Sequence, residues 1–376
     1  MQKKIIPVSN PLTTINDAKS VYDVVKNGWI SSSGKNIKLF ENKLAKFVNR
    51  KFACAVSSGT AALEIAVKSL ELNKNDEIIM PSFTIISNAI SIIKNSAKPV
   101  LIDSDLQTWN IKIEDIEKKI TKKTKAIMIP HIYGFPCEMD KIIKICKKKK
   151  LFLIEDAAEM IGQNYNEKPC GCFGDISTFS FYANKHITTG EGGMLFTNNS
   201  KLNEKFNLLK NLNFGKKERF NHTDISWNYR LTNMQATLGL SQFKRIKQIV
   251  KKKREIGNFY FNKFKNNKNI IIQPNKLKYA KNIYWVFGII LKNKNKKFRE
   301  NFQKKLLLKK IETRPFFVPM HKQDIFIKKG YFKNESYPIS EFLSSNGFYI
   351  PTGLDLSKKE LNYIANTIIN LISKIK

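Results

Sequence analysis

The order of apolar and polar residues divides the chain into two parts. In the first, the apolar runs at 52–57, 77–80, 99–103, 126–130 and 151–155 lack polar alternation, which is typical of parallel strands buried on both faces. Between these runs, apolar residues recur at helical spacing. The helices that this spacing predicts span 16–26, 38–47, 61–70, 84–94, 113–120 and 139–149. The alternation predicts an α/β domain whose parallel sheet is covered by helices.

The second part has fewer predicted strands, and one long helix over 232–264 leads into it. The other elements predicted here are a strand at 283–291 and helices at 297–308 and 358–375. We predict a large α/β domain over 14–245 and a small α+β domain over 246–376, with the arm 1–13 packing on the small one. Because no Pro/Gly-rich linker is present, the long helix is expected to join the domains.

Composition narrows the possible partners. The 376 residues include 66 Lys and Arg against 31 Asp and Glu, a net charge of +35. The lysines are spread along the whole chain without a nucleic-acid-binding motif, so no nucleic-acid partner is expected, although a basic surface would attract an anionic substrate. No apolar run approaches the ~20 residues that cross a bilayer, and the first residues do not resemble a signal peptide. We expect a cytoplasmic protein without membrane insertion.

The five cysteines do not predict a metal site. Cys170 and Cys172 form a Cys-x-Cys pair, but two further ligands at a suitable spacing are missing. Reduced, structural thiols are the expectation. Trp227 and Trp285 are expected to pack against other side chains of the fold.

Chemistry is expected at the ends of three predicted strands, because parallel strands deliver functional groups at their carboxyl ends. The first end, Ser57-Ser58-Gly59-Thr60, precedes a helix whose free N–H groups and positive dipole end could hold a phosphate, with an ordinary helix cap as the alternative. At the second, a buried Asp156 would need a cationic partner, such as the pyridinium nitrogen of pyridoxal phosphate. The alternative for Asp156 is a helix cap.

The third strand end carries the strongest signal. The strand-like run Phe179-Ser-Phe-Tyr leads to Lys185, and a glycine-rich turn follows it. A lysine among partly buried groups can lose its proton and form a Schiff base. Ser180 could bind a phosphate, and Asp156 and Lys185 could meet across neighbouring strands.

Together these segments resemble the DegT/StrS family of nucleotide-sugar aminotransferases, which are fold-type-I pyridoxal-phosphate enzymes. The resemblance covers nearly the whole chain and implies a mostly parallel seven-stranded sheet flanked by helices. It is also carried by residues 28–32, 81–84, 103–105, 131–134, 174–179, 228–236 and 312–317. Within the family, the segments that contain Glu159, Lys185 and Phe317 are most similar to the GDP-perosamine synthases.

The resemblance also implies roles for single residues. Lys185 would bind the cofactor covalently and move protons, Asp156 would pair with the pyridine nitrogen, and Glu159 would lie near the ring. The phosphate would be held by Ser58, Gly59, Thr60 and Ser180. Asn228 and Arg230 match a segment that reaches the partner subunit's phosphate region, which implies a homodimer with shared sites. The sugar and nucleotide pocket would include His131, Tyr133, Arg314, Phe317 and His321.

Two of these pocket residues, His131 and His321, could instead be structural. The sequence departs from the family at Ile85, where an aromatic residue usually stacks on the cofactor ring. An aliphatic side chain packs there without π-stacking geometry. The residues that could compensate are Phe83, Phe181 and Tyr182. Asn88, in the next helix, is expected to face the pocket.

The implied reaction moves an amine, with glutamate as the expected donor, onto a nucleotide-linked 4-keto-6-deoxy sugar. The product would be a 4-amino sugar for surface polysaccharide such as O-antigen. A 3-keto sugar aminotransferase and a sugar dehydratase of the same fold remain open, although Lys185 favours transamination because relatives that eliminate water carry His instead. A basic nucleic-acid-binding protein is the remote alternative.

Overall fold

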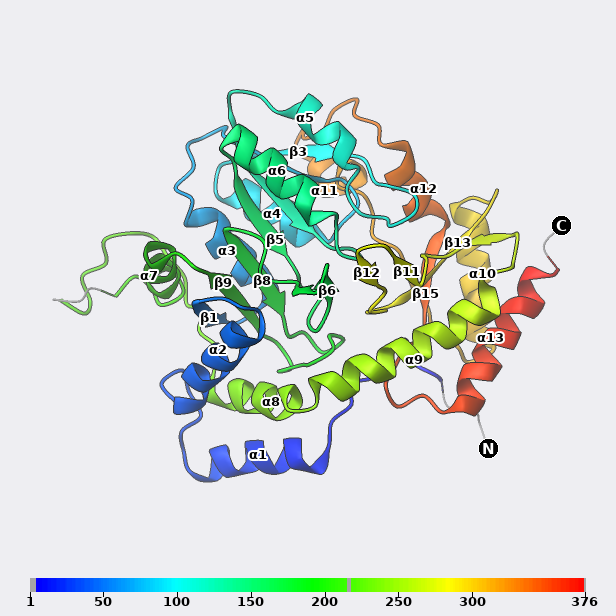
Figure 1. Ribbon diagram of the computed structural model, residues 1–376, viewed down its shortest axis with the longest axis horizontal. Helices are drawn as coiled ribbons and strands as arrows, with labels where there is room; N and C mark the ends of the chain where they lie inside the picture. Colours follow the sequence, from blue (N-terminus) through cyan, green and yellow to red (C-terminus); the bar gives the residue numbers. More distant parts are fainter. Residues whose placement is uncertain (1–4, 215–217, 375–376) are drawn as a thin grey trace.

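The computed structural model describes residues 5–214 and 218–374. Its centre is a seven-stranded sheet with the order β1-β9-β8-β5-β4-β2-β3 (Figure 1). Neighbouring strands are parallel from β8 to β3, and β9 is antiparallel to both β1 and β8. The strands are β1 (Phe52–Val56), β2 (Glu77–Pro81), β3 (Lys98–Ile102), β4 (Thr124–Pro130), β5 (Phe152–Asp156), β8 (Ile176–Ser180) and β9 (Gly193–Thr197). The mostly parallel α/β sheet that we predicted is confirmed.

Helices cover both faces of this sheet, because successive strand residues point to opposite sides. On one face, Ile78 and Met80 belong to a core with α3, α4 and α7. On the other, Ile79 packs with α5 and α6, and Phe179 packs with α2 and α8. The helices are α2 (Lys35–Phe47), α3 (Gly59–Lys68), α4 (Ile86–Lys94), α5 (Ile116–Lys119), α6 (Met139–Lys149), α7 (Ser200–Leu209) and α8 (Asn233–Phe243), with α1 (Ile15–Lys26) packed on α8.

A second, antiparallel sheet has the order β10-β13-β15-β14. Its strands are β10 (Ile270–Ile271), β13 (Phe287–Leu291), β14 (Arg314–Pro315) and β15 (Gly347–Ile350). The accompanying helices are α9 (Ile246–Phe264), α10 (Lys296–Leu308), α11 (Asp324–Lys328), α12 (Pro338–Asn346) and α13 (Lys358–Ile372). In Figure 1, α9 runs from the end of α8 toward this smaller sheet. The division of the chain at 245 and 246 stays a proposal, which the two separate sheets support.

The N-terminal arm lies against the segments that flank β14 and β15 in the smaller sheet. Ile6 forms an isolated bridge with Ile311, and the N–H of Val8 donates to Glu312 Oε2 at 3.0 Å. The carbonyl oxygen of Val8 accepts the N–H of Thr352 at 2.9 Å.

None of the helices within the described residues combines the length and apolar character that crossing a bilayer requires.

Three predicted elements differ from the structure. The long helix over 232–264 was wrong: it is two helices, α8 and α9, because Arg245 leaves helical geometry (φ −105°, ψ 8°) and binds Asp17 of α1 at 2.6 Å. The strand predicted from residue 283 begins at Phe287, since Tyr284 has a positive φ of 52°. The helix predicted over 113–120 is a 3₁₀ turn followed by the short α5. The last helix ends at Ile372, and its predicted end at residue 375 lies outside the described residues.

Candidate active site

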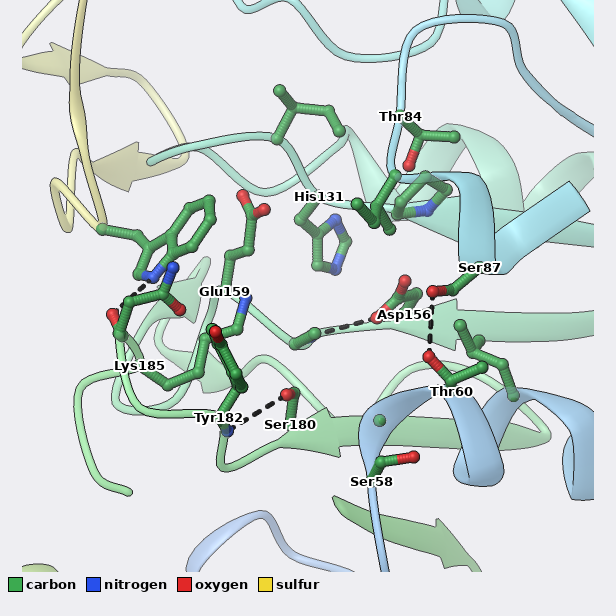
Figure 2. Close-up of a pocket in the computed structure, with 18 of the residues that line it drawn as sticks. Ser58, Thr60, Thr84, Ser87, His131, Asp156, Glu159, Ser180, Tyr182 and Lys185 are labelled. Atoms are coloured by element: carbon green, nitrogen blue, oxygen red, sulfur yellow. Dashed lines mark hydrogen bonds between the residues drawn. The ribbon is translucent and has the colours of Figure 1, made fainter. Parts of the chain in front are cut away.

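A cavity of about 440 Å³ opens at the carboxyl ends of β1, β4, β5 and β8. This is the edge where a parallel sheet places functional groups. Figure 2 shows Asp156, Glu159 and Lys185 around the same hollow as Thr60 and Ser180. The predicted site residues that line it are Ser58, Gly59, Thr60, His131, Asp156, Glu159, Ser180, Lys185 and Phe317.

The start of α3 forms one wall of the cavity. Ser58 is the N-cap, and its hydroxyl accepts the N–H of Ala61 at 3.0 Å. Ser58 therefore has the helix-capping role that we considered as the alternative to phosphate binding. The cavity still faces the free N–H end of this helix, which favours an anion. A Cβ atom added to Gly59 would lie 2.9 Å from Cβ of Ser180, so only glycine fits between the helix and β8. These features fit a phosphate group, and we call the N-terminus of α3 together with Ser180 the phosphate cradle.

Asp156 ends β5 and faces the cavity. Its Oδ2 accepts a hydrogen bond from Asn88 Nδ2 at 3.1 Å, and its Oδ1 accepts the N–H of Ala158 at 3.1 Å. Burial raises the pKa of this carboxyl, while the N–H of Ala158, Asn88 and Lys185 oppose the rise. Within the described residues Asp156 forms no salt bridge, so a cationic ring nitrogen would supply a countercharge that the chain does not. Asn88, expected to face the pocket, supports Asp156 instead.

The preceding acid, Glu155, points to the opposite face of the sheet and is fully buried. It accepts hydrogen bonds from the N–H of Gly171 (2.7 Å), the N–H of Phe173 (2.8 Å) and the hydroxyl of Ser177 (2.8 Å). Burial would raise its pKa, but His131 Nε2 at 3.3 Å and the N–H groups of Gly171 and Phe173 lower the pKa to about 2. The two adjacent acids therefore have different surroundings: Glu155 is hydrogen-bonded within the fold, whereas Asp156 faces the cavity.

His131 lines the cavity with its ring, but both ring nitrogens have partners. Nε2 lies 3.3 Å from Glu155, and Nδ1 accepts the N–H of Cys137 at 3.1 Å. His131, Glu155 and Cys170 are close enough to share a metal ion in the described part of the chain. The oxygens of Glu155 already accept several hydrogen bonds, and burial raises the pKa of the Cys170 thiol, so we assign this group to the fold.

Lys185 follows β8 in a loop that folds back on itself. The N–H of Phe181 donates to Gly192 O at 2.8 Å, and Gly190 has a φ of 81°, a conformation that favours glycine. The Lys185 ammonium lies 3.9 Å from the centre of the Trp285 ring. Burial lowers the pKa of Lys185, opposed by Glu159 and Asp156. A lowered pKa makes the neutral amine available, which is the form that attacks an aldehyde.

Glu159 lines the same cavity and lies on the Lys185 side of it (Figure 2). Its Oε2 accepts the N–H of Tyr133 at 2.6 Å. Burial raises the pKa of Glu159 well above the usual range of a carboxyl, although Lys185 opposes the rise. The raised pKa favours the protonated form, which can donate a hydrogen bond toward the cavity.

Several predicted residues do not line the cavity. Tyr133 is buried behind it, with its hydroxyl oxygen accepting the N–H of Phe317 at 3.3 Å. The ring nitrogens of His321 bind Ser82 (2.8 Å) and Glu341 (2.9 Å), which is the structural alternative that we considered. Arg314 is exposed and pairs with Glu312 at 2.7 Å.

Asn228 and Arg230 also lie outside the cavity of their own chain. Arg230 pairs through its backbone with Val56, next to the phosphate cradle, and its side chain donates to Asn211 Oδ1 at 2.7 Å. Their expected action in a partner subunit's site stays a prediction.

Sequence reasoning missed one wall of the cavity. Trp285, which we expected only to pack, lines it together with Tyr349 from β15. Neither residue belongs to a motif, and no local pattern connects them with Lys185. Ile85 lines the cavity as expected, and of the three possible compensating aromatics only Tyr182 does so; Phe83 and Phe181 are fully buried elsewhere.

Comparisons with known proteins show which sequences and structures this chain resembles. The family model for DegT/DnrJ/EryC1/StrS aminotransferases matches residues 12–369. GDP-perosamine synthase of Escherichia coli O157:H7 is 39% identical over 366 residues, 97% of this chain and 98% of that protein. The same-named protein of Vibrio cholerae is 36% identical, covering 99% and 100%. The structure of Helicobacter pylori PseC, an aminotransferase involved in pseudoaminic acid biosynthesis, has a TM-score of 0.94 at 27% identity, covering 99% and 100%.

Proposed function

Since this chain belongs to the DegT/DnrJ/EryC1/StrS aminotransferase family and is a pyridoxal-phosphate-dependent sugar aminotransferase, we propose that its substrate is a nucleotide-linked 4-keto-6-deoxy sugar. The product would be the 4-amino sugar, as the names of the two GDP-perosamine synthases indicate for those relatives. Glutamate is the proposed amine donor, and surface polysaccharide, such as O-antigen, is the proposed destination.

One observation carries the proposal: an amine and a carboxylate, Lys185 and Asp156, share a cavity with a helix N-terminus. The N–H groups around Gly59, with the hydroxyls of Thr60 and Ser180, would hold the cofactor phosphate. Asp156 would face the ring nitrogen. When bound, the cofactor supplies the electron sink that amino transfer needs.

The chain's own residues would then manage protons. Lys185 Nζ, with its lowered pKa, would take a proton from one reacting carbon and deliver it to another, between the substrate and the cofactor, which is general acid–base catalysis. Glu159, held by the Tyr133 N–H, would offer its proton as a hydrogen-bond donor. The walls formed by Phe317 and Trp285 would exclude water from this exchange.

A homodimer is part of the proposal, because Asn228 and Arg230 are proposed to complete the partner's phosphate site. Cytoplasmic location is also proposed. The net charge of +35 would attract a nucleotide diphosphate, whose charge is negative.

The test is to incubate the purified protein with pyridoxal phosphate, glutamate and a panel of keto sugar nucleotides. We expect a 4-amino product from a GDP-linked 4-keto-6-deoxy sugar, identified by NMR, and none from Lys185→Ala. A 3-amino product, or a sugar that has lost water without gaining nitrogen, would replace the proposal with one of its alternatives.

A further inference from the structure

The side-chain amine of Lys185 lies over an aromatic ring. Its Nζ lies 3.9 Å from the centre of the Trp285 ring. Two carboxyls, Asp156 and Glu159, influence this amine, yet within the described residues neither forms a salt bridge with it. A protonated Lys185 therefore lies in contact with the negative face of an indole, which among the aromatic side chains attracts a cation most strongly.

Trp285 is fixed in this position from two sides. Its indole N–H donates at 3.0 Å to the carbonyl oxygen of Asn184, the residue before Lys185. Its own carbonyl oxygen accepts a hydrogen bond at 3.1 Å from Lys253 Nζ, which also donates to Thr352 O at 2.9 Å. Trp285 is 4% exposed and Lys253 is 3% exposed. The ring and the lysine loop are thus coupled to each other and anchored to α9.

Resting on the proposed function, we propose that Trp285 is a positioning residue that holds the Lys185 ammonium whenever this lysine is not bonded to the cofactor. Amino transfer frees the lysine once in each full cycle, when the incoming substrate amine replaces it on the cofactor, and the freed amine then accepts the proton that leaves the substrate carbon. A carboxylate within hydrogen-bond distance would pair with the ammonium and resist its deprotonation. An aromatic face attracts the cation more weakly than a carboxylate does. It therefore keeps the amine close to the cavity but still allows the ammonium to lose its proton and react again.

The ring acts on Lys185 in two opposing ways. Its quadrupole favours the ammonium, whereas its bulk excludes water and disfavours it. The titratable groups that share the cavity with Lys185 are His131, Asp156, Glu159, Tyr182, Glu191 and Tyr349, with His186 and Lys253 close behind. Because these groups are unchanged in variants of Trp285, the sign of the shift in such variants separates the two effects.

The experiment measures how fast apoprotein captures pyridoxal phosphate at different pH values. Growth of the visible absorption band reports bond formation with Lys185, and its rate rises with the neutral fraction of the amine. We expect the midpoint of this pH dependence to fall in the order wild type, Trp285→Phe, Trp285→Leu. The fall should reach about 0.5–1.5 pH units in the leucine variant, from the usual strength of a cation–π contact. The cofactor's own ionisations are common to all variants and cancel in the comparison.

Two further variants act as controls. Lys253→Met leaves the ring in place but removes its anchor, and it should lower the midpoint by less than Trp285→Leu does. Phe316→Leu removes a buried aromatic ring that does not line the cavity, and it should leave the midpoint unchanged. Circular dichroism confirms folding for each variant.

The results separate this inference from the function on which it rests. A normal band with an unchanged midpoint in Trp285→Leu would overturn the inference and leave the proposed function intact. A midpoint that rises in both Trp285 variants would also overturn it, because the ring would then act only by excluding water. If wild type forms no band, or if Lys185→Ala still forms one, the proposed cofactor chemistry fails first.

Discussion

The two adjacent acids of β5 should respond in opposite ways to removal of their charge. Glu155 has a pKa lowered from 4.5 to about 2 in the folded protein. At about 1.4 kcal/mol per pH unit, the ionised form contributes about 3 kcal/mol to stability at neutral pH. Because this pKa is depressed, the contribution is present above pH ~4.5, where the unfolded chain is also ionised, and it is lost as the pH falls toward 2.

Glu155→Gln should therefore destabilise the apoprotein by about 2–4 kcal/mol, since its NH₂ group would also face N–H donors such as that of Gly171. Asp156→Asn is the matched control one residue away. Burial raises the pKa of Asp156, so removing its charge should leave stability unchanged or slightly higher while weakening cofactor binding.

The assays are urea unfolding of the apoprotein at pH 7 and titration with pyridoxal phosphate. A loss below about 1 kcal/mol in Glu155→Gln would refute the stability argument, because the buried hydrogen bonds would then contribute little. Equal stability losses in both variants would show that the charge of Glu155 contributes no more to stability than the charge of Asp156 does.

Three further predictions concern the site. Gly59→Val should weaken cofactor binding by at least about tenfold, because its Cβ would lie 2.9 Å from Ser180 and its methyl groups would enter the phosphate cradle; fluorescence titration measures this. Glu159→Gln should remove from the pH profile of kcat/KM an ionisation that lies above the usual carboxyl range, while keeping activity on its acidic side; a profile that keeps this ionisation assigns it to another group. If sites are shared, inactive Lys185→Ala and Arg230→Ala proteins should recover roughly a quarter of wild-type activity when refolded together in equal amounts, and no recovery would contradict sharing.

Sequence patterns predicted the elements and residues that depend on local order. The strand ends at Ser58, Asp156 and Lys185 could be found because an apolar run followed by polar residues marks the carboxyl edge of a parallel sheet. Their meeting in one cavity follows from the parallel topology, in which β5 and β8 are neighbours.

The remaining features depend on contacts between distant segments. The break at Arg245 comes from its ion pair with Asp17, and the helical periodicity continues across it. Trp285 reaches Lys185 because Tyr284 turns the chain with a positive φ, which no motif signals. The hydrogen-bond partner of His321 and the ion-pair partner of Arg314 were not indicated by any sequence pattern that we used, and they became visible only in three dimensions.

The position of β1 has a consequence for how the protein is made. Among the described strands, β1 pairs in the sheet only with β9, and Phe52 lies opposite Thr197. A ribosome must therefore complete well over a hundred further residues before the strand that leads into Ser58 can pair. Pairing over so long a separation slows folding and leaves an apolar strand uncovered on the nascent chain. Fragments that end before β9 should aggregate during synthesis and depend on chaperones.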